Sequence, residues 1–80
     1  MNLSELPISV RDNFEQTAEV LNGKLRLRGT RVSVEQVLEL LEAGVPPAEI
    51  VRSFPSLTEQ NVAAVERLAA HCTLSLLQPA

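Results

Sequence analysis

Glycine and proline divide the second half of this 80-residue chain into three short segments, and this spacing limits the folds open to it. Gly44 and the pair Pro46-Pro47 separate the first segment from the second, and Pro55 separates the second from the third. Glycine suits the left-handed residue that ends a helix, and proline suits a first helical turn, where its missing N–H is no loss. The pattern therefore predicts three helices joined by short turns.

Capping residues and apolar periodicity support each of these helices. Ser33 with Gln36 fits a capping box at the start of the first helix, and Thr58 is a suitable N-cap for the third. Leu57 and Val62 occupy the two positions of a hydrophobic staple around that cap. Apolar residues recur at helical spacing in the first and third helices: Val34, Val37, Leu38, Leu41; Val62, Val65, Ala69, Cys72. We predict a mainly α fold with a three-helix helix-turn-helix core over residues 33–72.

The preceding segment predicts a β-hairpin over residues 14–32. Asn22-Gly23 is a strong two-residue turn signal, since a type I′ turn needs positive φ at both positions. After it, basic residues alternate with Leu25 and Leu27, which predicts a strand with one cationic and one apolar face. Residues 17–21 are the expected partner strand. Residues 1–13 are expected to form a loosely held arm with a short ordered piece at residues 8–10, and residues 73–80 a tail into which the third helix can extend as far as Leu77.

Charge is strongly segregated along the chain. Residues 24–31 hold four of the seven basic side chains and no acid, whereas the rest carries three bases against ten acids. Such a strip can steer the protein towards phosphate or towards an acidic protein surface. The four candidate contacts are Lys24, Arg26, Arg28 and Arg31. A second interpretation is a solvated strand face whose charges pair with the chain's own acids, such as Glu15 and Glu19. Thr30 is expected to fix the turn through a backbone hydrogen bond, although it lies within the candidate site.

The first residues of the third helix are the second candidate site, because in helix-turn-helix DNA readers these residues point at base edges. Gln60 and Asn61 can in principle pair with adenine. Glu59 opposes a polyanion, and Arg67 is the one basic residue of this helix. If DNA is bound, the basic hairpin should therefore supply most of the affinity.

No residue pattern indicates catalysis, a metal or a cofactor. His71 and Cys72 point about 100° apart on a helix, so they cannot act as base and nucleophile, and two such residues alone make no structural zinc site. We expect Cys72 to pack as a small hydrophobe, His71 to be exposed, and Glu35, Glu39 and Glu42 to form a solvated face. A single cysteine and the lack of a long apolar run predict a soluble cytoplasmic protein outside the membrane.

The carboxyl-terminal leucines suggest self-association. Leu74, Leu76 and Leu77 would be unusual if left in water, and a chain this small gains stability by burying surface between subunits. They are expected to fold onto the core or to form a homodimer or partner interface with Leu40 and Leu68.

An ordered set of motifs resembles one bacterial family. The signature Gly29-Thr30-Arg31-Val32-x-Val34 is followed by Leu38, Leu41, Gly44, Glu49-Ile50, Phe54-Pro55-Ser56-Leu57-Thr58, Val62 and Ala64. This pattern, over about residues 20–70, is similar to that of the DUF433 family. Two positions depart from it: Leu25 follows Gly23-Lys24 where many members have proline, and Leu68 or a neighbour stands where many have an aromatic. The resemblance implies a homeodomain-like helix-turn-helix fold and an antitoxin-like role beside a PIN-like ribonuclease toxin.

Two functional hypotheses follow. The first is a non-enzymatic, antitoxin-like DNA-binding regulator, dimeric, which contacts phosphates through the basic hairpin and also binds a partner protein. The alternative is a protein-interaction module without DNA binding, which docks an acidic partner such as a PIN-like toxin.

Overall fold

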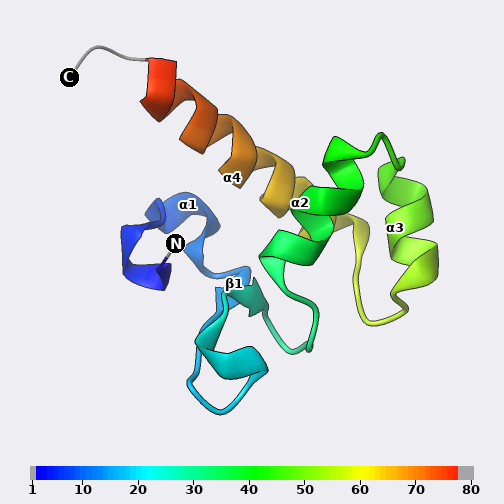
Figure 1. Cartoon of the computed structure of the whole chain (residues 1–80), viewed down its shortest axis with the longest axis horizontal. Coiled ribbons are helices and arrows are strands. Elements are labelled where there is room, and N and C mark those ends of the chain that lie inside the picture. The colour runs from blue at the N-terminus through cyan, green and yellow to red at the C-terminus, as the bar shows by residue number, and fades with distance from the viewer. Residues whose placement is uncertain (1, 78–80) are drawn as a thin grey trace.

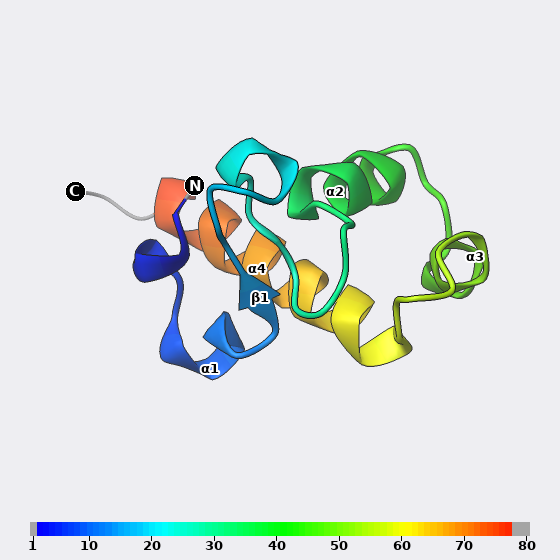
Figure 2. The same cartoon turned by 90° about the horizontal axis from the view of Figure 1, so that it is seen from below.

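The chain folds into a mainly helical domain with a short antiparallel hairpin near its amino end, as the computed structural model shows for residues 2–77, without the side chains of residues 75 and 76. Three longer helices follow the hairpin: α2 (Val34–Glu42), α3 (Pro47–Ser53) and α4 (Glu59–Leu77). Helix α4 is the central element, because it contacts α1 (Ile8–Arg11), α2 and α3 (Figures 1 and 2). The predicted fold class is confirmed.

The helix boundaries follow the local signals in the sequence. Ser33 Oγ accepts a hydrogen bond from the Gln36 backbone N–H at 3.0 Å and so caps α2. Gly44, with φ of +85°, ends α2. The N–H groups of Gly44 and Val45 donate to the carbonyl oxygens of Leu41 and Leu40, both at 3.0 Å, which is the double bond of a Schellman motif.

The hairpin differs from the prediction. Its strands are β1 (Phe14–Glu15) and β2 (Arg26–Leu27), with Phe14 opposite Leu27 and Glu15 opposite Arg26. Residues 17–21 form no strand, and the expected two-residue hairpin turn at Asn22-Gly23 is wrong. Leu21, Asn22 and Gly23 all have positive φ and form a short 3₁₀ turn, η2 (Leu21–Gly23), within the long β1–β2 connection. This register places Phe14 and Leu27 together in the core, which a turn at residue 22 would prevent.

The amino-terminal segment is packed rather than loose. It contains η1 (Leu3–Glu5) and α1, and the side chains of Leu6 and Val10 are buried in the core. The Arg11 guanidinium donates a 2.7 Å hydrogen bond to the Leu6 carbonyl, which holds the chain between η1 and α1. Leu6 and Val10 therefore make this segment part of the domain, whereas Ile8 is exposed; Met1 lies outside the described residues.

The core is built almost entirely from aliphatic side chains, with Phe14 as its one fully buried aromatic within the described residues. The largest completely buried side chains come from the hairpin and all three longer helices: Phe14, Leu27, Val37, Ile50, Val62, Val65 and Leu68. Among the α4 side chains that the structure describes, none that follows Leu68 is fully buried, although the helix continues to Leu77. The last turns of α4 therefore project beyond the core, as Figure 1 shows.

The expectations for the exposure of the α4 side chains are confirmed at two positions and wrong at a third. Cys72 is half-buried against the core, and His71 is exposed. The expectation that Leu68 is part of an interface is wrong. This side chain is buried inside the domain, because α4 packs it against the other helices. Leu74 and Leu77 are exposed; the Leu76 side chain and residues 78–80 lie outside the described part.

Candidate binding surface at the 28–31 loop

The Gly-Thr-Arg signature forms a tight loop at the end of a second, shorter β-pairing. The backbone N–H of Leu27 donates to the Val32 carbonyl at 3.0 Å, and that of Val34 donates to the Leu25 carbonyl at 2.9 Å. Arg26 forms an antiparallel bridge with Ser33 between these two bonds. Residues 28–31 are thus the loop that joins β2 to α2, and we refer to them as the 28–31 loop.

Arg26 is part of the interior, not of a cationic face. Its side chain is about nine-tenths buried, and its guanidinium donates to the Thr30 carbonyl at 3.0 Å and to Glu15 Oε1 at 3.3 Å. A third bond, at 3.3 Å, reaches Thr17 Oγ1. The expectation that alternate residues of this strand face solvent is wrong at Arg26, whereas Lys24 and Arg28 are exposed and Leu25 and Leu27 are buried, as predicted. Leu25 and Leu27 belong to the hydrophobic core, and Arg26 between them is enclosed by its bonds to other residues, so three consecutive side chains are buried.

Glu15 joins the buried arginine to the loop backbone. The same carboxylate oxygen that accepts from Arg26 also accepts a 2.7 Å hydrogen bond from the Gly29 N–H. Gly29 has φ of +76°, a conformation that other residues adopt only with strain. The interpretation in which the chain's own glutamates neutralise the basic strip is therefore confirmed for Arg26 and Glu15, whereas Glu19 is exposed.

Thr30 fixes the loop from within, as expected. Its hydroxyl donates to the Leu27 carbonyl at 2.9 Å and accepts from the Val32 N–H at 3.1 Å. The side chain is buried, so it contacts the protein's own backbone and presents no surface to a ligand. Thr30, Arg26 and Glu15 together hold the loop in one conformation.

Arg28 and Arg31 are the basic residues that this loop presents to solvent. Both are exposed, and within residues 2–77 neither has an ion-pair partner. Lys24 is also exposed, but its Nζ lies 3.9 Å from a carboxylate oxygen of Glu35 on α2, a weak surface pair. Of the four predicted cationic contacts, Arg28 and Arg31 are therefore the two that are exposed and, within residues 2–77, without an ion-pair partner.

In the second candidate site, at the start of α4, capping hydrogen bonds occupy one of the predicted contact residues. Thr58 Oγ1 accepts from the Asn61 N–H at 3.2 Å, and Asn61 Oδ1 accepts from the Thr58 N–H at 2.8 Å. Asn61 is therefore occupied in a reciprocal capping box, a role that its position three residues after a threonine could have indicated. Gln60 and Arg67 are exposed, and so are Glu59 and Glu66 beside them.

The 28–31 loop and the beginning of α4 lie on the same side of the molecule. In both views of the ribbon, the loop that precedes α2 lies next to the chain that leads into α4 (Figures 1 and 2). A partner that contacts Arg28 and Arg31 can therefore also meet the first turn of α4. Within the described residues, no group of three or more histidine, cysteine, aspartate or glutamate side chains is placed to hold a metal ion.

The structure thus defines a small trihelical domain with a rigid basic loop. The chain belongs to the DUF433 family, described as proteins of unknown function, whose profile matches residues 15–69. Its fold is similar to the crystal structure of a DUF433 member protein from Anabaena variabilis ATCC 29413, with a TM-score of 0.63 and 22% sequence identity over 95% of this chain and 90% of that one. A comparison with curated proteins gave no match. None of the helices in the described part of the chain is long and apolar enough to cross a membrane.

Proposed function

We propose that this protein is a non-enzymatic binding module that docks an acidic surface of a partner protein through Arg28 and Arg31. The observation that carries the proposal is the 28–31 loop, whose backbone is bonded to Glu15 and Arg26 and whose Thr30 hydroxyl joins the residues on either side, while its two arginines are exposed. An arginine held on a fixed backbone loses little conformational freedom when it binds, and its planar fork matches a carboxylate.

The partner that we propose is the acidic face of a PIN-like ribonuclease toxin, which would make this chain an antitoxin-like protein of the cytoplasm. The proposal includes a homodimer, because the exposed Leu74 and Leu77 at the end of α4 offer apolar surface to a second copy. It includes no catalytic role for any residue.

The test compares two variants with the same change in net charge. The partner is purified from the native host with the tagged protein, and its affinity is then measured by calorimetry. We expect Arg28→Ala/Arg31→Ala to weaken binding by about tenfold or more, because paired arginines are common binding hot spots. The control, Arg52→Glu, makes the same change in net charge at an exposed arginine outside both candidate sites and should change affinity about twofold at most. Equal losses in the two variants would contradict the assignment.

DNA binding is the second candidate function, favoured by the position of the 28–31 loop beside the start of α4. Two arginines per subunit would give a dimer about four phosphate contacts and a slope of about −3.6 in log affinity against log salt. Titration of a DNA duplex at several salt concentrations measures this slope. Glu59, Glu66 and the acidic face of α2 are the reason that we place DNA second.

A further inference from the structure

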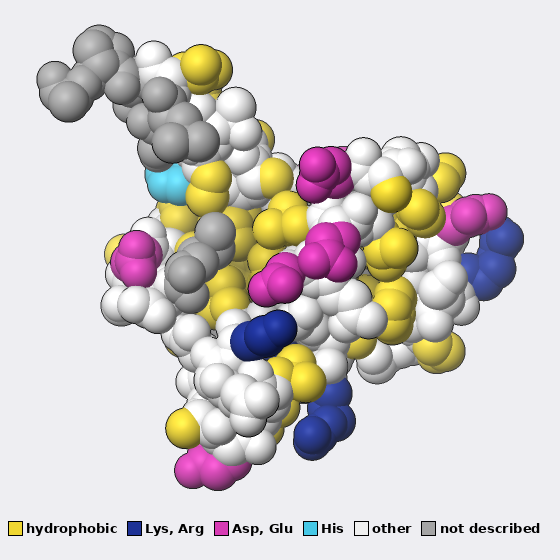
Figure 3. All heavy atoms as spheres, in the orientation of Figure 1, with side chains coloured by type: hydrophobic (Ala, Val, Ile, Leu, Met, Phe, Trp, Pro, Cys, Tyr) yellow, Lys and Arg dark blue, Asp and Glu magenta, His cyan; other side chains and the backbone are white. Residues whose placement is uncertain are grey.

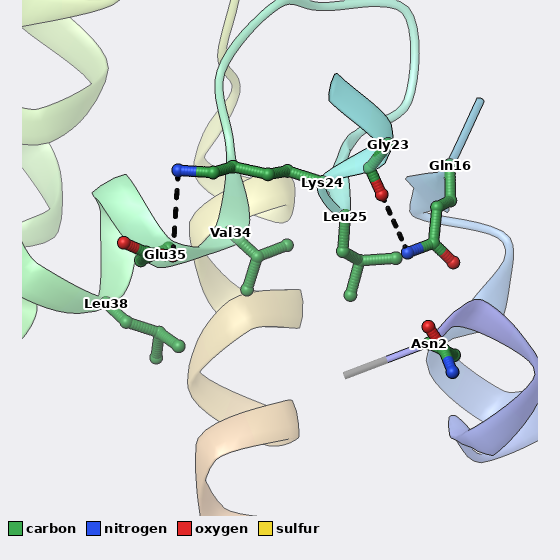
Figure 4. A pocket seen from close by; sticks show the side chains of 8 residues that line it. All are labelled: Asn2, Gln16, Gly23, Lys24, Leu25, Val34, Glu35 and Leu38. Atoms are coloured by element: carbon green, nitrogen blue, oxygen red, sulfur yellow. Dashed lines mark hydrogen bonds and ion pairs between the residues drawn. The ribbon is translucent and has the colours of Figure 1, made fainter. Parts of the chain in front are cut away.

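A groove runs along α2, on a different part of the surface from the 28–31 loop residues. Its first part is a hollow of about 380 Å³ between the amino-terminal segment and α2, where Leu25, Val34 and Leu38 are apolar and Lys24 and Glu35 are charged (Figure 4). Its second part, of about 680 Å³, lies between α2 and α4 and is lined by Leu38, Leu41, Glu42, Glu66, Ala69 and Thr73. Leu38 lines both parts, and we refer to the two together as the α2–α4 groove.

The floor of this groove is apolar and incompletely covered. Leu38, Leu41 and Ala69 are half-buried, so each leaves apolar surface facing the hollow. On α4, Ala69 and Thr73 lie four residues apart and therefore share one helical face. An apolar surface of this kind, bordered by charged residues, is typical of a protein-binding groove.

The rim of the groove is acidic. Glu35, Glu42 and Glu66 line it with Lys24 as the one cation among the lining residues, and Lys24 already lies 3.9 Å from Glu35. Within residues 2–77, neither Glu42 nor Glu66 has an ion-pair partner. Figure 3 shows the same arrangement: acidic side chains gather over α2 beside a hollow whose surface is apolar.

We propose that the α2–α4 groove binds a basic amphipathic helix of a protein partner. An apolar face with residues at i, i+3, i+4 and i+7 would lie on the leucines, and Lys or Arg on its flanks would meet the acidic rim. A second copy of this chain fits less well, because the carboxyl-terminal part of α4, residues 69–77, contains no Lys or Arg. This inference is independent of the proposed role of the 28–31 loop.

The test uses a synthetic amphipathic helical peptide with a leucine face and lysine flanks. Its affinity for the full chain is measured by fluorescence anisotropy and compared with that of a peptide in which every lysine is glutamate. We expect the lysine peptide to bind at least about tenfold more tightly, with a difference that decreases as salt is added. Equal affinities, or no binding of the lysine peptide, would overturn the proposal.

Variants locate the peptide on the protein. Glu42→Gln/Glu66→Gln should weaken the lysine peptide about fivefold, whereas Glu49→Gln/Glu59→Gln, with the same charge change on exposed residues outside the lining of the groove, should leave its affinity unchanged. Arg28→Ala/Arg31→Ala should also leave it unchanged, which separates this site from the loop. Leu41→Asp should abolish binding while the circular dichroism spectrum stays native. If Leu41→Asp instead dissociates a dimer in sedimentation, a second copy covers the groove and the proposal is wrong.

Discussion

The 28–31 loop and the α2–α4 groove both present charge, but different forces hold that charge in place. In the loop, polar side chains fix the backbone: the buried Arg26 and the half-buried Glu15 bond to it, and the Thr30 hydroxyl joins the residues on either side. In the groove, regular helices place Glu35, Glu42 and Glu66 at the rim, and no buried polar bond is needed. Single substitutions in the loop should therefore lower the free energy of unfolding more than substitutions at the rim of the groove.

The largest effect should come from Arg26→Ala, which would test whether the loop depends on its buried arginine. The change leaves the Thr30 carbonyl and the Glu15 carboxylate without their charged donor, so we expect the free energy of unfolding to fall by about 2–3 kcal/mol. Arg28→Ala, two residues away, should change it by no more than about 0.5 kcal/mol, because that side chain is exposed. Urea denaturation measures both. Equal effects of the two substitutions would refute the division of this strand into a structural and a surface arginine.

Thr30→Val should have the next largest effect. Valine has nearly the same shape but offers no hydroxyl, so the Val32 N–H loses its acceptor and the Leu27 carbonyl loses one donor. We expect a loss of about 1–2 kcal/mol in the free energy of unfolding. Thr73→Val is the matched control, since the Thr73 hydroxyl bonds to the Ala69 carbonyl at an exposed position. Faster amide hydrogen exchange at Val32 in Thr30→Val would show that the effect is local to the loop.

Gly29→Ala tests backbone strain in the same loop. A Cβ atom at this position would meet no atom within 4 Å, so only the positive φ of +76° opposes it. We expect a loss of about 1 kcal/mol, measured by thermal and urea unfolding. A loss near zero would mean that the loop adopts another conformation at no cost and is not rigid.

The smallest effect should be that of Glu42→Gln/Glu66→Gln on stability. Both side chains are exposed and, within residues 2–77, without an ion-pair partner, so the free energy of unfolding should change by no more than about 0.5 kcal/mol. Unfolding in urea at low and high salt checks this. A larger loss would mean that these carboxylates support the fold, and the contrast between loop and groove would fail.

Local sequence signals predicted the helices and failed at the hairpin. Ser33, Gly44 and Thr58 act on their own neighbours, so their positions were enough to place the helix ends. Asn22-Gly23 does adopt positive φ, but the hairpin register is set by Phe14 and Leu27, which are far apart in sequence and meet only in the core. A local turn signal carries no information about such a pairing.

The same distinction explains the candidate site. Lys24, Arg26, Arg28 and Arg31 look equivalent in the sequence, because alternation alone assigns three of them to one strand face. Arg26 differs from the other three because its side chain is buried and its guanidinium bonds to Glu15. Both features depend on the tertiary fold. The capping role of Asn61 was readable from its distance to Thr58, whereas the burial of Leu68 inside the domain required the packing of α4.

The two connections that flank β2 differ in how much extra chain they can accommodate. Residues 17–19, in the long β1–β2 connection, are exposed, so a peptide tag placed between Ala18 and Glu19 should leave the hairpin pairing intact. One extra residue between Gly29 and Thr30 would shift the Thr30 hydroxyl away from Leu27 and Val32. Length variation and engineered fusions should therefore be accepted in the first connection and rejected in the second.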